Sequence, residues 1–235
     1  MLQYRLVAIA ALAITLAGCI TTEVPVTGEF PAIVMRPLPY VVGVHYPDEL
    51  KAYTHEEKLL TGRTWVVELG AIHVSFFDGV LAGIFTQLVR VEELPTAGSP
   101  VRNVDGIIQP RIEDFQFATP DQTQSEFYEV WIRYRMSLYS PAGKLVERWP
   151  LSAYGKSRSQ FAQAKDSIND ATIVAMRDAA ALLAVKFKTE PDVPEWFAAQ
   201  EEKRTPVNYT GAGTEADRDS AGPRRAAGDD QPGAR

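Results

Sequence analysis

The chain has 235 residues, and 46% of them are hydrophobic, which is enough apolar material for the core of one sizeable domain. Its 30 acidic residues outnumber its 24 basic residues, and a formal net charge of −6 does not favour nucleic acid or anionic lipid as a partner. A single cysteine excludes an internal disulfide, so the fold must rely on its hydrophobic core.

An apolar run precedes that cysteine near the N-terminus. Arg5 is the only cation before it, and residues 6–16 are apolar except for Thr15. The run is roughly half the ~20 residues that a membrane span requires, and small residues lie close to its end. The pattern predicts a secretory signal peptide over residues 1–18.

The residues that close this segment, Leu16, Ala17, Gly18 and Cys19, resemble the lipobox of bacterial lipoprotein precursors. The resemblance implies that the signal peptidase recognises the first three and cuts before Cys19, which receives a diacylglycerol on its thiol and an acyl chain, such as palmitate, on its new amino group. No other cofactor is expected. Position 20 is Ile20 and not Asp, which by the same resemblance implies sorting to the outer membrane of a Gram-negative envelope, facing the periplasm. The alternative is a cysteine that happens to end an ordinary secretory signal.

The mature chain divides into three parts. Residues 19–39 contain four prolines after the cysteine and no sustained apolar period, which predicts a lipidated N-terminus and an extended tether, with an edge strand near residues 33–35 as the alternative. Residues 40–202 are predicted to form a single periplasmic domain. Residues 203–235 are almost free of large apolar side chains, so we expect this tail to be disordered.

Strand and helix periods alternate along the first half of the domain. Alternating apolar residues predict strands at 40–46 and 63–69, with a turn or one helical turn at 47–53. Between Ala71 and Phe85 apolar residues recur every three or four positions, which predicts a helix. Gly79 and Gly83 weaken that helix but would permit close packing. A strand at 88–92 and a loop at 94–103 follow.

The clearest strand pattern lies in the second half. A long strand is predicted at 104–117, bent at Pro110, and residues 128–138 alternate strictly between apolar and polar side chains. Residues 145–156 return as the partner of 128–138 in a hairpin. We expect facing residue numbers there to sum to an odd value, because that register places the apolar residues of the two strands on one face: Leu145, Trp149, Leu151 and Ala153 opposite 128–138. A three-residue loop with Gly143 in the left-handed conformation gives the even register unless a bulge, for example near Pro150, corrects it.

A long alanine-rich helix is predicted from Asp166 or Ser167 to about Lys188, followed by a Trp196-Phe197 clasp onto the core. The helix is expected to bury one stripe of side chains: Ile168, Ala171, Thr172, Ala175, Ala179, Leu182, Leu183 and Phe187. Long consecutive strands with two main helices indicate an α+β two-layer sandwich with a mostly antiparallel sheet. This order of elements, over roughly residues 40–190, is similar to that of outer-membrane assembly and transport-auxiliary lipoproteins. The resemblance carries over no functional residue beyond Cys19.

The sequence contains no complete pattern of a catalytic, metal or phosphate-binding site. His45, His55 and His73 have neither a cysteine ligand nor a second histidine at helical spacing, so no metal site is expected. Gly155-Lys156-Ser157 matches only the end of a phosphate-binding loop, because Pro150 stands where that loop requires glycine. We therefore expect no enzymatic activity.

Some ionisable groups could still take part in a site. His73 and Asp78 share a predicted helix, and Glu113 and Asp114 could lie near a sheet edge. Lone groups of this kind are more often solvated or satisfied within the structure.

The candidate interaction residues are aromatic and basic, and they fall on the polar side of the predicted hairpin: Trp131, Arg133, Arg135, Tyr139 and Tyr154. Exposed aromatics beside arginines are typical of protein interfaces, although these residues could also support the tether.

Two functions remain open. The first is a non-enzymatic scaffold or auxiliary subunit of an envelope complex, held to the membrane by its lipid and to an envelope protein by this face. The second is a periplasmic lipid- or glycan-binding module with a cleft between the alanine-rich helix and the sheet.

Overall fold

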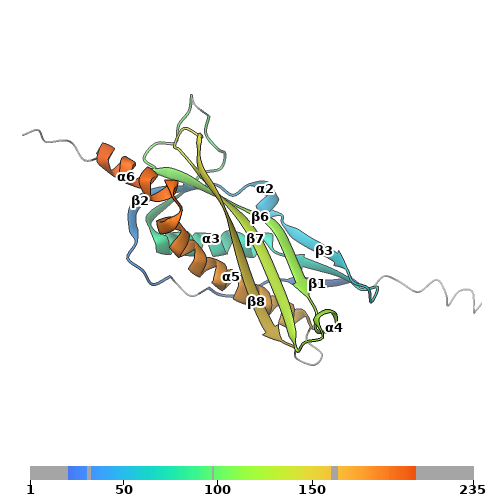
Figure 1. Cartoon of the computed structure of the whole chain (residues 1–235). Coiled ribbons are helices and arrows are strands. Elements are labelled where there is room, and N and C mark those ends of the chain that lie inside the picture. The colour runs from blue at the N-terminus through green and yellow to red at the C-terminus, as the bar shows by residue number, and fades with distance from the viewer. Residues whose placement is uncertain (1–20, 31–32, 97, 160–163, 205–235) are drawn as a thin grey trace, which may run out of the picture. The chain divides into compact units, whose positions relative to one another are not determined.

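The computed structural model describes residues 21–30, 33–96, 98–159 and 164–204 (Figure 1). These residues form eight strands and five helices, which confirms the predicted α+β class. In chain order the elements are β1 (Thr21–Pro25), β2 (Leu38–Val44), α2 (Asp48–Lys51), β3 (Thr54–Lys58), β4 (Thr64–Glu68), α3 (Gly70–Ile84), β5 (Phe85–Arg90), β6 (Gly106–Ala118), α4 (Pro120–Thr123), β7 (Phe127–Tyr139), β8 (Leu145–Arg158), α5 (Ala164–Thr189) and α6 (Asp192–Arg204). The tail that was predicted to be disordered lies outside the described residues, except that α6 extends through Arg204.

The described strands form two sheets. The larger has the order β5-β2-β6-β7-β8, and the smaller has the order β1-β4-β3. The long β6, β7 and β8 run antiparallel in sequence order, as predicted. Both sheets are nevertheless mixed, because β1 pairs in parallel with β4, and β2 pairs in parallel with β5 and β6. Parallel partners require crossover connections, and α3 lies on the one from β2 to β5, which also includes β3 and β4.

Strand β1 lies in the segment that was predicted to be an extended tether. Its five residues pair with Thr64–Glu68, which satisfies the backbone groups on the side that faces β4, and Val24 is buried. The tether prediction is therefore wrong for residues 21–25, where the alternation of only Thr22, Val24 and Val26 was too short to reveal a strand. Residues 33–35 are not in a strand either, and Ile33 instead packs against Gly83 of α3.

Strand β3 was also missing from the prediction. Its sequence, THEEK, contains no large apolar side chain, and it forms because it pairs with β4 along its whole length. The imidazole of His55 faces the core side, with its ring centre 5.1 Å from that of Phe115. Tertiary pairing, and not local propensity, defines this strand.

The β7–β8 hairpin has the predicted odd register over most of its length. Tyr128 faces Ser157, and Met136 faces Trp149. Gly143 does adopt the left-handed conformation, with a φ of 81°, and a bulge beside Tyr139 then restores the odd register. The bulge lies next to the turn and not near Pro150. Leu145 belongs to this irregular end and is exposed, so its predicted place on the buried face is wrong.

The even-numbered side chains of β7 form the centre of the core. They are buried from Tyr128 to Leu138 beneath the second layer, to which α3, α5 and the three-stranded sheet all contribute (Figure 1). On the α3 side, Phe77 packs edge to face on Tyr134, with ring centres 5.6 Å apart. The opposite, odd-numbered face of β7 is left without a covering helix over most of its length.

Helix α5 lies very close to the sheet at Gly155 of β8. A Cβ at this position would lie 2.2 Å from the carbonyl oxygen of Ala171 and 2.3 Å from the amide nitrogen of Ala175. Both alanines are fully buried, so at this point the interface between α5 and the sheet is filled by backbone and small side chains. The predicted apolar stripe of α5 is correct except for Leu182, which is exposed, and Met176 is buried instead.

The predicted Trp196–Phe197 clasp is confirmed, and it belongs to α6. Phe197 is buried and stacks on Tyr40 with ring centres 4.6 Å apart. The indole Nε1 of Trp196 donates a hydrogen bond to the backbone carbonyl of Asp105 at 2.8 Å. The carboxylate of Asp105 also pairs with Arg204 at 3.2 Å, which fastens the end of α6 to the sheet.

We predict that Gly155→Ala lowers the free energy of unfolding by about 1–3 kcal/mol or more, because the new methyl group would meet helix backbone that cannot move aside on its own. Gly79→Ala is the matched control. A Cβ at Gly79 meets nothing within 4 Å, and alanine is the better helix former, so this variant should gain up to ~1 kcal/mol. Urea unfolding followed by circular dichroism measures both changes. Equal stability of the two variants would contradict the close approach of α5.

Candidate functional site

The lipobox, Leu16–Cys19, lies outside the described residues, so the structure begins just after it. Thr21 is the first residue of β1 and pairs with Thr64. The predicted attachment point is therefore separated from the folded domain by Ile20 alone.

Two aromatic residues mark the open face of the five-stranded sheet. Trp131 and Tyr154 are cross-strand partners on β7 and β8, with ring centres 5.4 Å apart, and they are 40% and 39% exposed. The hydroxyl of Tyr154 donates a hydrogen bond to Glu129 at 3.1 Å, which fixes one edge of the pair. We call this side of the sheet, on β6, β7 and β8 around Trp131, the outer face.

Two arginines continue the outer face from Trp131 along β7. Arg133 lies 3.3 Å from Asp114 and 3.7 Å from Glu113, and Arg135 donates a hydrogen bond to Glu113. That hydrogen bond, with the positive charges of Arg135 and Arg133, lowers the pKa of Glu113 below its usual range. The carboxylate is therefore ionised at neutral pH, and the cluster is a network of ion pairs that opens to solvent.

A bulge in β6 brings the two carboxylates together. Ile112 faces Tyr134 and Asp114 faces Arg133, so Glu113 is an extra residue without a partner of its own in the ladder. The bulge turns both acidic side chains toward the arginines. Among the described strands, β6 pairs at this point with β7 alone, because its pairing with β2 covers only Gly106–Ile108, so Glu113 and Asp114 lie near a sheet edge, as the sequence suggested.

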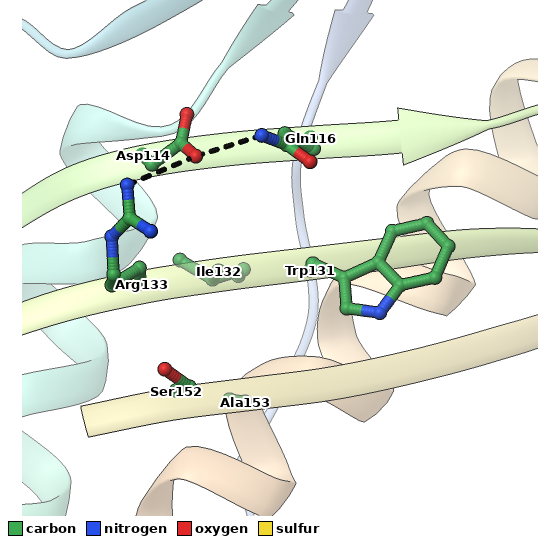
Figure 2. Close-up of a pocket in the computed structure, with 7 residues that line it drawn as sticks. All are labelled: Asp114, Gln116, Trp131, Ile132, Arg133, Ser152 and Ala153. Carbon is green, nitrogen blue, oxygen red and sulfur yellow. Dashed lines mark hydrogen bonds and ion pairs between the residues drawn. The ribbon is translucent and has the colours of Figure 1, made fainter.

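A shallow hollow of about 350 Å³ lies beside Trp131 on the outer face. Figure 2 shows that residues from β6, β7 and β8 line it: Asp114, Gln116, Trp131, Ile132, Arg133, Ser152 and Ala153. Asp114 accepts hydrogen bonds from Gln116 at 2.9 Å and from Arg133 at 3.3 Å, so these polar groups hold one another in place (Figure 2). The hollow offers an indole ring next to fixed hydrogen-bonding groups.

Tyr139 is not part of this group, although the sequence placed it there. Its hydroxyl donates a hydrogen bond to Gln109 at 3.1 Å, and its ring packs against the small cluster of Val91, Val104 and Ile107. The odd-numbered face of β7 is covered at this end, so Tyr139 supports the fold. The structure does bring together the other four predicted residues: Trp131, Arg133, Arg135 and Tyr154.

Sequence reasoning did not find Gln116 and Ser152, which line the hollow. Gln116 faces Trp131 across β6 and β7, and Ser152 faces Arg133 across β7 and β8. The hairpin register alone could have placed Ser152, because the odd sum pairs it with Arg133. Gln116 depends on the bulge in β6, for which the sequence gives no signal.

The histidines occupy separate places in the fold. His73 of α3 is fully buried, and its ring nitrogens hydrogen-bond to the carbonyl oxygen of Leu69 at 2.7 Å and to the Tyr134 hydroxyl at 2.8 Å. Burial lowers the pKa of His73 to about 4, so the ring is neutral, with Nδ1 donating to Leu69 and Nε2 accepting from Tyr134. Within the described ranges no three His, Cys, Asp or Glu side chains are grouped closely enough to hold a metal ion.

Asp78 is engaged within the structure as well. It accepts hydrogen bonds from Tyr46 and from Arg90, each at 2.8 Å, and the guanidinium of Arg90 lies 4.4 Å from the centre of the Tyr46 ring. Asp78 and His73 share α3, but each has its own partners.

No family model matches the chain, and no curated protein matches it in sequence. Among solved structures, a Xanthomonas campestris protein of the family DUF330 is similar at 12% identity and a TM-score of 0.47, over 78% of this chain and 100% of that one. A minor lipoprotein of Acinetobacter baumannii is 10% identical with a TM-score of 0.33, over 66% and 95% of the two chains. Uncharacterised lipoprotein B of Nitrosomonas europaea is 12% identical with a TM-score of 0.37, over 70% and 97%. Two of these three are lipoproteins by name, and at such values the likenesses carry no inference about function.

The described helices include none that combines the length and the hydrophobicity needed to cross a bilayer.

We predict that the buried His73 makes the domain less stable in acid. Its pKa is about 4 in the folded protein and about 6.5 in the unfolded chain, so the unfolded chain binds the proton first as the pH falls. The free energy of unfolding should fall by up to ~1.4 kcal/mol per pH unit between about pH 6.5 and pH 4. His73→Gln should remove this component, as measured by denaturant unfolding across that range. An unchanged pH dependence in the variant would contradict the neutral buried ring.

Proposed function

We propose that this protein is a lipid-anchored, non-enzymatic subunit of a bacterial envelope complex that binds a protein partner through the outer face of β6, β7 and β8. The observation that carries the proposal is the exposed Trp131–Tyr154 pair beside a network of arginines and carboxylates. Large rigid aromatics flanked by arginine are the residues that most often dominate protein interfaces. On this sheet they lie on the face that the helices do not cover.

The charges of the outer face support binding more than catalysis. Glu113 is held ionised by Arg135 and Arg133, so it is not protonated near neutral pH and cannot act as a general acid. Asp114 is engaged by Gln116 and Arg133. These groups are partly exposed, and paired charges at the rim of an interface set orientation and association rate.

The anchor is inferred from sequence and supported by the course of the chain. Leu16-Ala17-Gly18-Cys19 has the lipobox order, and a thiol acylated there would be joined to β1 through a single residue. Two or three acyl chains hold a protein on a membrane far more firmly than one. Because Ile20 follows the cysteine, we propose the outer membrane, with the domain facing the periplasm.

A second candidate function is the binding of a glycan in the hollow beside Trp131. Its volume of about 350 Å³ is at the lower end of ligand sites, and its lining combines an indole ring with Asp114, Gln116 and Ser152. This site differs from the cleft expected between the alanine-rich helix and the sheet, because α5 packs against β8 without a gap at Gly155.

The partner proposal predicts that Trp131→Ala/Tyr154→Ala removes binding. Truncating two central aromatics should cost about 2 kcal/mol or more, which is at least ~30-fold in Kd. The measurement is quantitative capture of the envelope partner from solubilised membranes by the lipidated protein. Leu145→Ala/Val185→Ala is the matched control, since both residues are exposed apolar side chains away from the outer face. Equal capture by both variants would refute the interface, and recovery of carbohydrate in place of protein would favour the glycan.

The anchor proposal predicts that Cys19→Ser abolishes acylation and leaves an uncleaved precursor or a soluble form, because serine lacks the thiol that receives the diacylglycerol. Intact-mass spectrometry and membrane fractionation check both effects, with Thr21→Ser as a control outside the lipobox. A Cys19→Ser protein with the wild-type mass shift and membrane association would show that no lipid is attached at this position.

A further inference from the structure

The start of β1 fixes which end of the domain lies nearest to the anchor. Two residue steps separate Cys19 from Thr21, and a chain spans at most ~3.6 Å per step, so the two Cα atoms are no more than about 7 Å apart. Thr21 faces Thr64, the first residue of β4. Neighbouring strands lie about 4.8 Å apart, so a lipid on Cys19 would hold the beginning of β4 within about 12 Å of the attachment point.

The beginning of β4 is one side of the turn that joins it to β3. The amide of Leu59 donates to the carbonyl of Arg63 at 3.0 Å, and Gly62 adopts a left-handed φ of 80°. The two leucines of this tight turn lie in different environments. Leu59 is buried, with 8% of its surface exposed, whereas Leu60 is fully exposed to solvent, at 105%. In Figure 1 the β3–β4 turn projects away from the five-stranded sheet, on the opposite side of the domain from α6.

The charges around this turn are sorted along the strands. Lys58 ends β3, Arg63 precedes β4, and the outward row that contains Thr21, Thr64 and Lys58 has no carboxylate. The outward acidic side chains lie farther along the strands: Glu23 and Glu56 both face Val66 in the next outward row, and Glu68 follows in the row after that. Glu57, which precedes Lys58, is on the other side of β3 and pairs with His55. Two residues along a strand add about 6.6 Å, so the cations are at the tip and the carboxylates stand behind them. The turn itself, residues 58–63, thus carries two cations and no carboxylate, although the strands behind it and the whole chain are acidic.

We propose that the β3–β4 turn is a membrane-docking element that rests on the phospholipid leaflet holding the lipid anchor. Leu60 enters the boundary between headgroups and acyl chains, while Lys58 and Arg63 contact lipid phosphates. The inference rests on the proposed acylation of Cys19, because the short connection to β1 is what brings this turn to the bilayer. An exposed apolar side chain between two cations is the combination that binds an anionic membrane surface.

The docking element gives the domain an orientation. With Cys19 and the β3–β4 turn as two contacts on the membrane, β1 and β4 leave the surface side by side. The domain then stands directly on the leaflet and does not hang from a long tether.

The test uses the lipidated protein in vesicles of phosphatidylethanolamine and phosphatidylglycerol, with Leu60→Cys labelled by an environment-sensitive fluorophore. The acylated Cys19 is the only native cysteine, so the introduced thiol is the only one free to react. Leu145→Cys, at the turn of the β7–β8 hairpin, is the matched control, because Leu145 is also exposed. We expect a blue shift and a loss of emission with nitroxide-labelled lipid at position 60 and neither effect at position 145. Lys58→Glu/Arg63→Glu should reduce the quenching at position 60.

The outcomes separate the docking element from the anchor. A protein that floats with the vesicles but shows equal quenching at the two positions, or none at either, keeps its anchor and overturns the docking element. A probe at position 60 that is shielded but not quenched by labelled lipid indicates a protein neighbour and also overturns it. A protein that does not float and carries no lipid overturns the anchor, and the docking element with it.

Discussion

The close contact between α5 and the sheet determines where this protein can bind anything. Gly155 lets the backbone of the helix lie directly against β8, and the buried alanines of α5 leave no room for a ligand at this contact. Because the helices, together with the small sheet, cover one face of β7, the odd-numbered face opposite remains available. The position of the outer face therefore follows from how the core is packed. Its side chains are those of β6, β7 and β8 that point away from the core.

The outer face combines an aromatic pair with a set of charges that are already paired. Arg133 and Arg135 are already paired within the sheet, because Glu113 and Asp114 form ion pairs with them. Partial exposure makes each of these pairs weak on its own account. Their effect is to hold the arginines extended beside Trp131, so a partner would meet a surface whose side chains have already lost part of their conformational freedom.

The sequence was most informative where burial repeats regularly. The alternation from Tyr128 to Leu138, the stripe of α5 and the odd hairpin register all follow from apolar spacing, and the structure confirms them. The sequence was uninformative where a segment forms a strand only because a partner strand lies beside it. Thr54–Lys58 and Thr21–Pro25 become strands only because Thr64–Glu68 lies between them, and neither segment has a periodic pattern long enough to predict this.

The candidate site shows the same division between local and tertiary signals. Trp131, Arg133, Arg135 and Tyr154 could be placed on one face by counting along the hairpin. The same counting failed for Tyr139, which is drawn into the cluster around Ile107. It could not have placed Glu113 and Asp114, which share a side only because β6 contains a bulge. A bulge inserts one residue into a strand, so every side chain beyond it points to the opposite face from the one that counting predicts. Counting by twos therefore assigns faces correctly only as far as the bulge.

The parallel pairing of β1 with β4 also has a mechanical meaning. A pull applied through residue 20 would act along the axis of β1, and all five register positions from Thr21 to Pro25 would resist it together in shear. Separating a strand in this direction requires its hydrogen bonds to fail at once, whereas peeling a hairpin breaks them one after another. Tension between membrane and domain would thus be carried into β4, the central strand of the small sheet, and through its buried Trp65 and Val67 into the core.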